Sequence, residues 1–416
     1  MQPSASPASA DVHVKVVRSA PDLERARSFW QQWESHPTVE WSACEALVAT
    51  GGGSTKTVAF VHGDETAPKA MLVAMDAWTR TTVQLGYWRV ANPRVRVLSV
   101  KHGGGWLGPL SDESARAFVS AARREMRDEG CTMLHLEHFP IDHPLVAAAM
   151  AAGASWMRPE PDVNWRVAIP ASWAEFTAAC SKNTRRNLKR YPERFLEEFG
   201  ARAAVKCWSA PEDLARIVEE MDAVARHSYH RSLGAGFLNA PEQVALIRAA
   251  LRNGTYRCWV LHIDGAPAAF WDGRRARGTF FTDFTAYLPQ YRDARPGWYL
   301  LTKVIADLCV DPAVDTIDFG QGDAQYKQML GTESSQEVSV AMYAPTFRGR
   351  SLRALVGATA GGTRIARRVL DRLGLLSRVK RLWRRRLADD PAKPADGVAD
   401  ERAEKVADKG RGGATD

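Results

Sequence analysis

The chain has 416 residues, of which 45% are hydrophobic and 9% aromatic, and its formal net charge is +8. This length suggests two domains, and the composition suits packed cores and excludes a low-complexity protein. The six cysteines form no C-x-x-C pair, which is typical of reduced thiols and not of a disulfide framework or a zinc site. We find no signal-peptide core and no membrane-length apolar run, so we expect a cytoplasmic protein.

The basic charge is concentrated in one late segment. Residues 346–386 contain 13 Lys or Arg and one acidic residue, whereas residues 387–416 contain five basic and eight acidic residues. The part of the chain before residue 346 is therefore close to neutral. The overall charge gives no argument for nucleic-acid binding.

The first predicted unit spans residues 11–155, after a Ser/Ala/Pro-rich segment at 1–10 that we expect to be disordered. Alternating apolar and polar residues predict its strands, and amphipathic segments predict its helices. The expected strands are 13–19, 55–63, 70–79, 95–100 and 131–139. The expected helices are 21–36, 112–130 and 142–154. This is a complete α/β unit.

A second unit with a similar order of elements follows at residues 156–345. Its expected strands are 163–170, 201–209, 256–264, 266–275, 278–287 and 313–320. Its expected helices are 171–181, 181–200, 211–230, 240–254 and 297–311. Asp264–Gly265 predicts a tight hairpin turn, and the segment 181–200 is predicted to be helical on both sides of Pro192. The sequence therefore predicts a mixed α/β fold with two tandem units.

The character of the chain changes in an extension at 346–387. Residues 376–387 place apolar side chains on one helical face and Arg or Lys on the rest, which predicts a basic amphipathic helix. This helix could lie on an anionic membrane surface, with Trp383 at the interface, or pack on the body of the protein. Nucleic-acid binding is less favoured because no aromatic stacking platform accompanies the helix. Residues 388–416 are expected to be disordered.

A stripe of cations occurs in SKNTRRNLKR, residues 181–190. On a helix, Lys182, Arg185, Arg186 and Lys189 share one face. This stripe would suit the phosphate or carboxylate of a substrate carrier. The alternative is a solvated basic face.

The segment YRDARPGWYLLTK, residues 291–303, places two arginines and a glycine at the start of a predicted helix that follows a strand. Backbone N–H groups at a helix N-terminus are a natural binding site for pyrophosphate. The candidate residues for this cofactor site are Arg292, Arg295, Gly297 and Trp298.

The segment DFGQGDAQYKQML, residues 318–330, combines two glycines with several polar groups after the last predicted strand. Glycines let a backbone approach a ligand closely. Asp323 could orient or deprotonate an acceptor, and Tyr326 could protonate a leaving thiolate. Lys327 and Gln321 are candidates for substrate binding. The alternative is a structural turn with Asp323 and Lys327 paired on one helical face.

Histidine occurs in three further segments. His227, on the helix predicted over 211–230, is a candidate base near neutral pH. HGGGW at 102–106 resembles the oxyanion-hole segment of lipases, but no G-x-S-x-G accompanies it, so we interpret it as a glycine-rich loop. HLEHFPIDH at 135–143 splits its histidines between two strand faces, which favours packed histidines over a metal site.

The order of these segments resembles a known family. The basic segment, the histidine-containing helix, the loop at 291–303 and the DFG-x-GD-x-x-YK segment together look like the BioF2-like acetyltransferase domain of the CelD/BcsL group. That group is a branch of the GCN5-related N-acetyltransferase (GNAT) superfamily and is related to Fem-type aminoacyl transferases. The chain departs from the usual loop pattern at Arg295, where the family has glycine.

This resemblance implies two GNAT-like units and transfer of an acyl group, with acetyl expected, from acyl-CoA to an amine or hydroxyl. The implied acceptor is a sugar or polysaccharide precursor, and no metal is expected. One rival is a Fem-like transferase that uses aminoacyl-tRNA, with the basic extension helping to hold the tRNA. Another is a non-catalytic scaffold that docks on a membrane beside a polysaccharide synthase. Acyl-CoA binding separates these functions.

Overall fold

The computed structural model describes residues 13–51, 53–64, 66–85, 88–158, 160–228 and 236–372. The disordered ends predicted at 1–10 and 388–416 and the basic helix predicted at 376–387 lie outside these residues. Within the described ranges, no helix is both long and apolar enough to cross a membrane.

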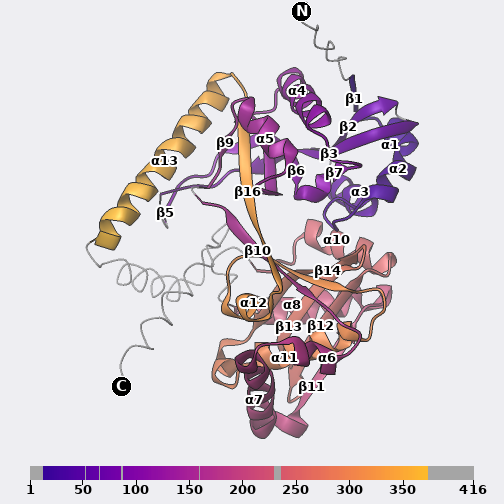
Figure 1. Cartoon of the computed structure of the whole chain (residues 1–416), viewed down its shortest axis with the longest axis vertical. Helices are drawn as coiled ribbons and strands as arrows, with labels where there is room; N and C mark the ends of the chain where they lie inside the picture. The colour runs from indigo at the N-terminus through magenta and orange to yellow at the C-terminus, as the bar shows by residue number, and fades with distance from the viewer. Residues whose placement is uncertain are drawn as a thin grey trace, which may run out of the picture.

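The predicted mixed α/β fold is confirmed. One large sheet runs through the molecule in the order β1-β2-β3-β6-β8-β16-β10-β15-β14-β13-β12-β11, and helices of both units pack against it (Figure 1). β7 pairs with β3, β9 pairs with β16, and β4 pairs with β5 in a separate ribbon.

The N-terminal unit is built around its strands β1 to β9. They are β1 (Val14–Val17), β2 (Thr55–Asp64), β3 (Ala67–Arg80), β4 (Val83–Leu85), β5 (Trp88–Ala91), β6 (Arg94–Lys101), β7 (Trp106–Leu107), β8 (Met133–Pro140) and β9 (Ser155–Trp156). Its helices are α1 (Ala20–Arg25), α2 (Arg27–Trp33), α3 (Trp41–Thr50), α4 (Asp112–Asp128) and α5 (Pro144–Ala151), with a 3-10 turn η1 (Gly103–Gly105). α4 begins where the Ser111 hydroxyl accepts the Ser114 N–H, and it buries an apolar stripe that includes Phe118 and Met126.

The C-terminal unit holds the remaining strands. They are β10 (Asp162–Ala168), β11 (Ala203–Trp208), β12 (Tyr256–Ile263), β13 (Ala266–Ala276), β14 (Thr279–Tyr287), β15 (Thr316–Gln321) and β16 (Glu333–Tyr343). The helices are α6 (Trp173–Ala179), α7 (Lys182–Phe199), α8 (Leu214–Ala225), α10 (Pro241–Arg252), α11 (Pro296–Cys309) and α12 (Gln325–Leu330). Three 3-10 turns complete it, η2 (Gly200–Arg202), η3 (Pro211–Asp213) and η4 (Pro289–Ala294). α13 (Phe347–Arg372) follows this unit as an extension and packs beside β4 and β16.

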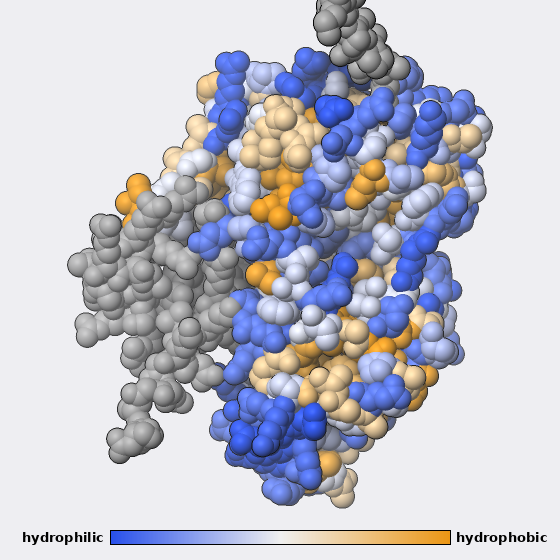
Figure 2. Space-filling view, in the orientation of Figure 1, coloured by the Kyte–Doolittle hydropathy of each residue, from blue (hydrophilic) through white to orange (hydrophobic). Residues whose placement is uncertain are grey.

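Two local predictions can be checked directly. The hairpin between β12 and β13 turns at Asp264 and Gly265, whose φ values are 53° and 81°, so the predicted tight turn is confirmed. α7 continues through Pro192 as one helix. Its exposed polar face is part of the strongly hydrophilic area at the lower end of the molecule in Figure 2.

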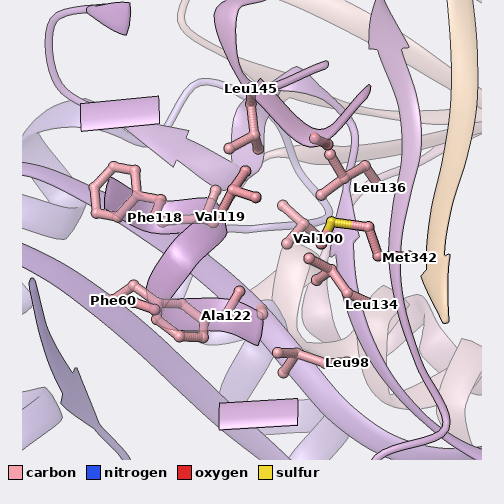
Figure 3. Close-up of a cluster of buried hydrophobic side chains, with 14 of the residues drawn as sticks. Phe60, Leu98, Val100, Phe118, Val119, Ala122, Leu134, Leu136, Leu145 and Met342 are labelled. Atoms are coloured by element: carbon pink, nitrogen blue, oxygen red, sulfur yellow. The ribbon is translucent and has the colours of Figure 1, made fainter. Parts of the chain in front are cut away.

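The two units share one strand. β16 pairs with β10 at Glu333–Glu337 and with β8 at Glu337–Tyr343, so it passes from one unit into the other. Its second half is therefore buried in the N-terminal core, where Met342 lies beside Leu134 (Figure 3). No local sequence pattern predicted this contribution to the first unit.

Further contacts fix the two units across their interface. The Arg277 Nε donates to the carbonyl of Glu34 at 2.7 Å, and the Asn253 side chain donates to the Ser42 hydroxyl at 2.7 Å. The Arg274 guanidinium donates to the carbonyl of Pro37 at 3.3 Å. These bonds hold the N-terminal α2–α3 region against α10 and β13 of the other unit.

Candidate active site

A cleft of about 670 Å³ lies between the two units. The N-terminal unit contributes the loop after α2, the HGGG segment and the end of β8. The C-terminal unit contributes β10, β14, the end of β15, the start of α12 and Glu337 of β16. Both units are therefore needed to form it.

β14 and β15 diverge at the cleft. They pair in parallel only through Thr279–Phe281 and Thr316–Asp318. Beyond these pairs, Thr282–Thr285 line the cleft from β14, and Phe319–Asp323 line it from the end of β15. Peptide groups beyond these pairs are not used in the ladder between the two strands. Some have other partners, since the N–H of Phe284 donates to the Asp272 carboxyl at 2.8 Å and the carbonyl of Gln321 accepts from Lys327. The remaining groups can bind a ligand chain.

Hydrogen bonds from nearby residues of the same segment stabilise the turn after β15. Lys327 is buried, and its ammonium donates to the carbonyl of Gln321 at 2.6 Å. The Asp318 carboxylate accepts the N–H of Gly320 at 2.8 Å, and Gly320 has a φ of 67°. The glycine is needed at that φ, because other residues adopt it at a cost. Lys327 thus stabilises the turn that lines the cleft.

One predicted pair is not formed as expected. α12 begins at Gln325, after an extended Ala324, so Asp323 precedes the helix and does not share a helical face with Lys327. Asp323 instead accepts hydrogen bonds from the Trp165 indole at 3.2 Å and from the side chain of Gln328.

Glu337 stands where β16 passes from β10 to β8 and lines the cleft. Burial raises its pKa to about 7, and the nearby Asp318 carboxylate adds to the increase. The Gln321 amide donates to it at 3.1 Å, which favours the charged form. A carboxyl group whose pKa lies near the working pH is suited to act as a general base. Nothing in its sequence context distinguished Glu337.

Three histidines from the N-terminal unit form a stack in the lining of the cleft. The ring of His102 lies 4.2 Å from that of His36 and 5.5 Å from that of His138, measured between centroids. Burial lowers the pKa of His102 to about 4 and that of His138 to about 3, so both rings are neutral near neutral pH. They come from the two segments interpreted above as a glycine-rich loop and as packed histidines.

The backbone is strained at two of these histidines. His102 and His138 have φ values of 53° and 55°, in the left-handed region that costs a non-glycine residue roughly 1 kcal/mol or more. The N–H of His138 is bound by the Ser339 hydroxyl at 3.1 Å beside an irregularity in the β8–β16 pairing. Backbone strain in residues that line a cleft is common at functional sites.

The cleft also contains a charged network. The buried Asp318 accepts hydrogen bonds from Arg166 at 2.8 Å and from Asn164 at 3.0 Å. On the neighbouring strands, Arg274 forms a two-point ion pair with Asp283 at 2.6 and 2.7 Å. These pairs fix both edges of the opening between β14 and β15.

The candidate residues of the segment 318–330 are brought together in the cleft. Gln321, Asp323, Tyr326 and Lys327 all line it. Tyr326 is half-buried, with its ring near the edges of Trp271 and Phe319.

His227 does not join this group. α8 was predicted to end at residue 230, but it ends five residues earlier, at Ala225. The chain leaves the helix at Arg226, and the Ser228 hydroxyl donates to the carbonyl of Ala225. His227 is exposed in that turn and is not among the residues that line the cleft.

The predicted basic stripe is exposed on α7 and lies outside the cleft lining. Arg185 donates to the carbonyls of Thr177, Ala178 and Cys180 and so caps the end of α6. Its guanidinium therefore has a structural partner, whereas Lys189 lies 3.9 Å from Glu193 in an exposed pair.

The predicted pyrophosphate loop lies at the start of α11, beyond the end of β14. Arg295 adopts a φ of 56°, and its guanidinium lies 4.3 Å from the ring of Tyr191. No side chain of the described residues caps this helix start, and a Cβ at Gly297 would meet only the Tyr287 ring, at 3.7 Å. The helix start is thus accessible, although Arg292, Arg295, Gly297 and Trp298 do not line the cleft itself.

Residues 182–328, which run from α7 into α12, match a family model described as an acetyltransferase (GNAT) domain. The chain carries a GNAT domain. This domain includes β14, α11, β15 and most of the segment 318–330. The prediction of a GNAT-type acyltransferase is confirmed by the match.

Several solved structures are similar to the chain. FemX is similar with a TM-score of 0.56 and 11% identity, over 82% of this chain and 99% of that chain. A tandem GNAT protein of the clavulanic acid pathway has a TM-score of 0.47 at 13% identity, over 80% and 99% of the two chains. L-PGS from Bacillus licheniformis has a TM-score of 0.47 at 12% identity, over 85% and 98%. At these identities, the likeness to FemX shows the fold alone, and no curated protein matches the chain.

Proposed function

We propose that the chain transfers an acyl group, expected to be acetyl, from acyl-CoA to an amine or hydroxyl in the cleft between the units. The divergence of β14 and β15 carries this proposal, because the gap between them leads into the cleft that contains Glu337. A donor chain along β14 would meet an acceptor that enters between the units. The GNAT match covers both strands.

The donor would extend from the gap to the start of α11. Peptide groups of β14 beyond Phe281 would hold the pantetheine arm, and the accessible N-terminus of α11 would bind the pyrophosphate. Arg292 and Arg295 are exposed beside that terminus and would add positive charge.

The chemistry is a direct attack on the thioester. The acceptor nitrogen or oxygen bonds to the carbonyl carbon while the carbon–sulfur bond breaks, and Glu337 takes the proton of the acceptor. Tyr326 would return a proton to the departing thiolate, which leaves as the CoA thiol. Backbone N–H groups beside the gap would stabilise the negative oxygen, and holding both substrates together would supply much of the rate.

A polar acceptor such as a sugar or polysaccharide precursor suits the cleft. Three of its lining residues have buried polar atoms without a hydrogen-bond partner among the described residues, namely His138 Nδ1, Asn164 Oδ1 and Thr282 Oγ1. Neutral imidazole rings and amide groups can bind hydroxyl groups without the cost of desolvating a charge. A CelD/BcsL-type acetyltransferase is the family assignment that this acceptor would fit.

Acyl-CoA binding is the first test. We expect the full chain to bind acetyl-CoA and CoA saturably in isothermal titration calorimetry. Arg295→Ala should weaken binding about tenfold, as expected for a lost charge-assisted hydrogen bond, and Gly297→Trp should weaken it at least as much by covering the helix start. Arg248→Ala, at an exposed arginine of α10, is the matched control and should bind like the wild type.

The same titration separates the rival functions. Absence of saturable binding by the wild type would rule out acyl-CoA as the donor. Salt-sensitive binding of aminoacyl-tRNA in its place would support the Fem-like function. Absence of both, with retention on anionic vesicles, would support a scaffold.

A further inference from the structure

A second concave site lies on the N-terminal unit. It has a volume of about 480 Å³ and is formed by the last turns of α4, the turn after α5, the end of β16 and the start of α13. The residues that line it and those that line the cleft are two separate sets within the described chain. Acyl transfer in the cleft therefore does not explain it.

The polar lining of this site consists mainly of arginine. Arg123, Arg124 and Arg127 come from α4 and Arg353 comes from α13, and all four are exposed. Arg124 donates to the neutral hydroxyl of Ser120 at 3.1 Å. No acidic residue of the described chain is in the lining.

The acidic residues near the end of α4 do not neutralise these arginines. Glu125 forms an ion pair with Arg18, and Glu129 pairs with Arg96 at 2.8 Å, in a network on another side of the helix. Asp128 is in none of the ion pairs formed by the described residues. Among the described residues, the arginine cluster therefore has no ion-pair partner.

Such a cluster is unfavourable unless an anion joins it. Arg123 and Arg127 are four residues apart on α4, a spacing at which like charges destabilise a helix. The helix dipole can explain Arg127 in the last turn of α4, but it does not explain Arg353, which lies beyond the first turn of α13. The positive pole of α13 adds to the potential of the site, since Pro345 just before the helix lines it too.

The floor of the site is apolar. Met126 and Met342 are buried there, beside Gly153 and the ring of Tyr343. Burial raises the pKa of Tyr343 to about 12, so its hydroxyl stays neutral. The site thus combines a cationic rim with a floor that suits carbon atoms.

We infer that this arginine site binds the phosphate group of a phosphate ester, with the carbon part of the ester on the apolar floor. Guanidinium groups donate paired hydrogen bonds to phosphate oxygens, and four of them exceed the need of a carboxylate. A free phosphate ester and a phospholipid headgroup present the same chemistry. Residues 346–386, with 13 basic residues and one acidic residue, extend the positive charge from the site along the sequence.

The test uses the full chain and two probes. Glycerol 3-phosphate is titrated by calorimetry, and retention is measured on vesicles of phosphatidylcholine alone and of equal parts phosphatidylcholine and phosphatidylglycerol. The variants are Arg123→Gln with Arg127→Gln, and Arg353→Gln from the other helix. Arg116→Gln is the matched control, because Arg116 is an exposed arginine of α4 that does not line the site.

We expect saturable binding of glycerol 3-phosphate that falls about tenfold or more in both site variants and stays unchanged in Arg116→Gln. Loss of anionic-vesicle retention in the same variants would identify a lipid as the source of the phosphate. Unchanged retention would identify a free ester. Equal affinity in site and control variants, or no saturable binding by the wild type, would overturn the inference. Acetyl-CoA titration of the same variants tests the proposed activity separately, because these arginines do not line the cleft.

Discussion

Glu337→Gln is expected to lower kcat/KM for acyl transfer by about 100- to 10,000-fold, the usual contribution of a general base. The amide keeps the shape of the side chain and its contact with Gln321, but it cannot take a proton. Wild-type kcat/KM should rise with pH and level off above about 7, where the carboxyl is deprotonated. This rise should disappear in the variant. Steady-state rates with acetyl-CoA across the pH range measure both effects.

Burial and the charges that face Glu337 together set the position of that pH profile. Asp318 and Asp162 raise its pKa and Arg166 lowers it, while burial is the main cause of the increase. Glu333→Gln is the matched control, because Glu333 lies four residues earlier on the same strand and is exposed. A pH profile that is the same in Glu337→Gln and the wild type would exclude Glu337 as the base and return the role to Asp323.

The same substitution should make the protein more stable at neutral and higher pH. Glu337 has a folded-state pKa of about 7 against 4.5 in the unfolded chain, so its contribution to stability is present below pH 4.5 and is lost as pH rises through 7. The difference corresponds to roughly 3 kcal/mol at full ionisation. Glutamine has no charge to desolvate. Denaturant unfolding of both proteins near pH 4.5 and above pH 7 checks this sign.

The sequence predicted the helices and strands whose apolar residues recur with a clear period. The apolar residues of α4 recur with the helical period. This helix was predicted to within two residues of its observed end. α3 was missed because its apolar residues do not form one stripe, although Trp41, Ala43 and Cys44 are buried. The helix predicted over 21–36 is divided at Ala26, whose N–H donates to the carbonyls of Leu23 and Glu24.

The candidate site was predicted only in part, for a different reason. Segment 318–330 stood out because its glycines and polar groups are adjacent in sequence, and it does line the cleft. His36, His102, His138 and Glu337 come from separate elements of the chain and meet only through the tertiary fold. The raised pKa of Glu337 depends on its burial between two units, which no local pattern encodes.

Met342→Ala is expected to reduce the free energy of unfolding of the whole chain by about 2–5 kcal/mol, the range for removing a buried side chain of this size. Met342 belongs to the C-terminal unit by sequence, but it is buried in the N-terminal core, near Val100 and Leu134 (Figure 3). Residues Glu333–Glu337 of the same strand pair with β10, so loosening one half of β16 should loosen the other.

Denaturant unfolding followed by circular dichroism and tryptophan fluorescence should therefore give one transition, shifted to lower denaturant in the variant. Met150→Ala, at a methionine of α5 that is 37% exposed, should change stability by less than about 0.5 kcal/mol. Two separate transitions, of which Met342→Ala moves only one, would show that β16 does not couple the units. In that case the continuous strand would not by itself hold the two sides of the cleft together.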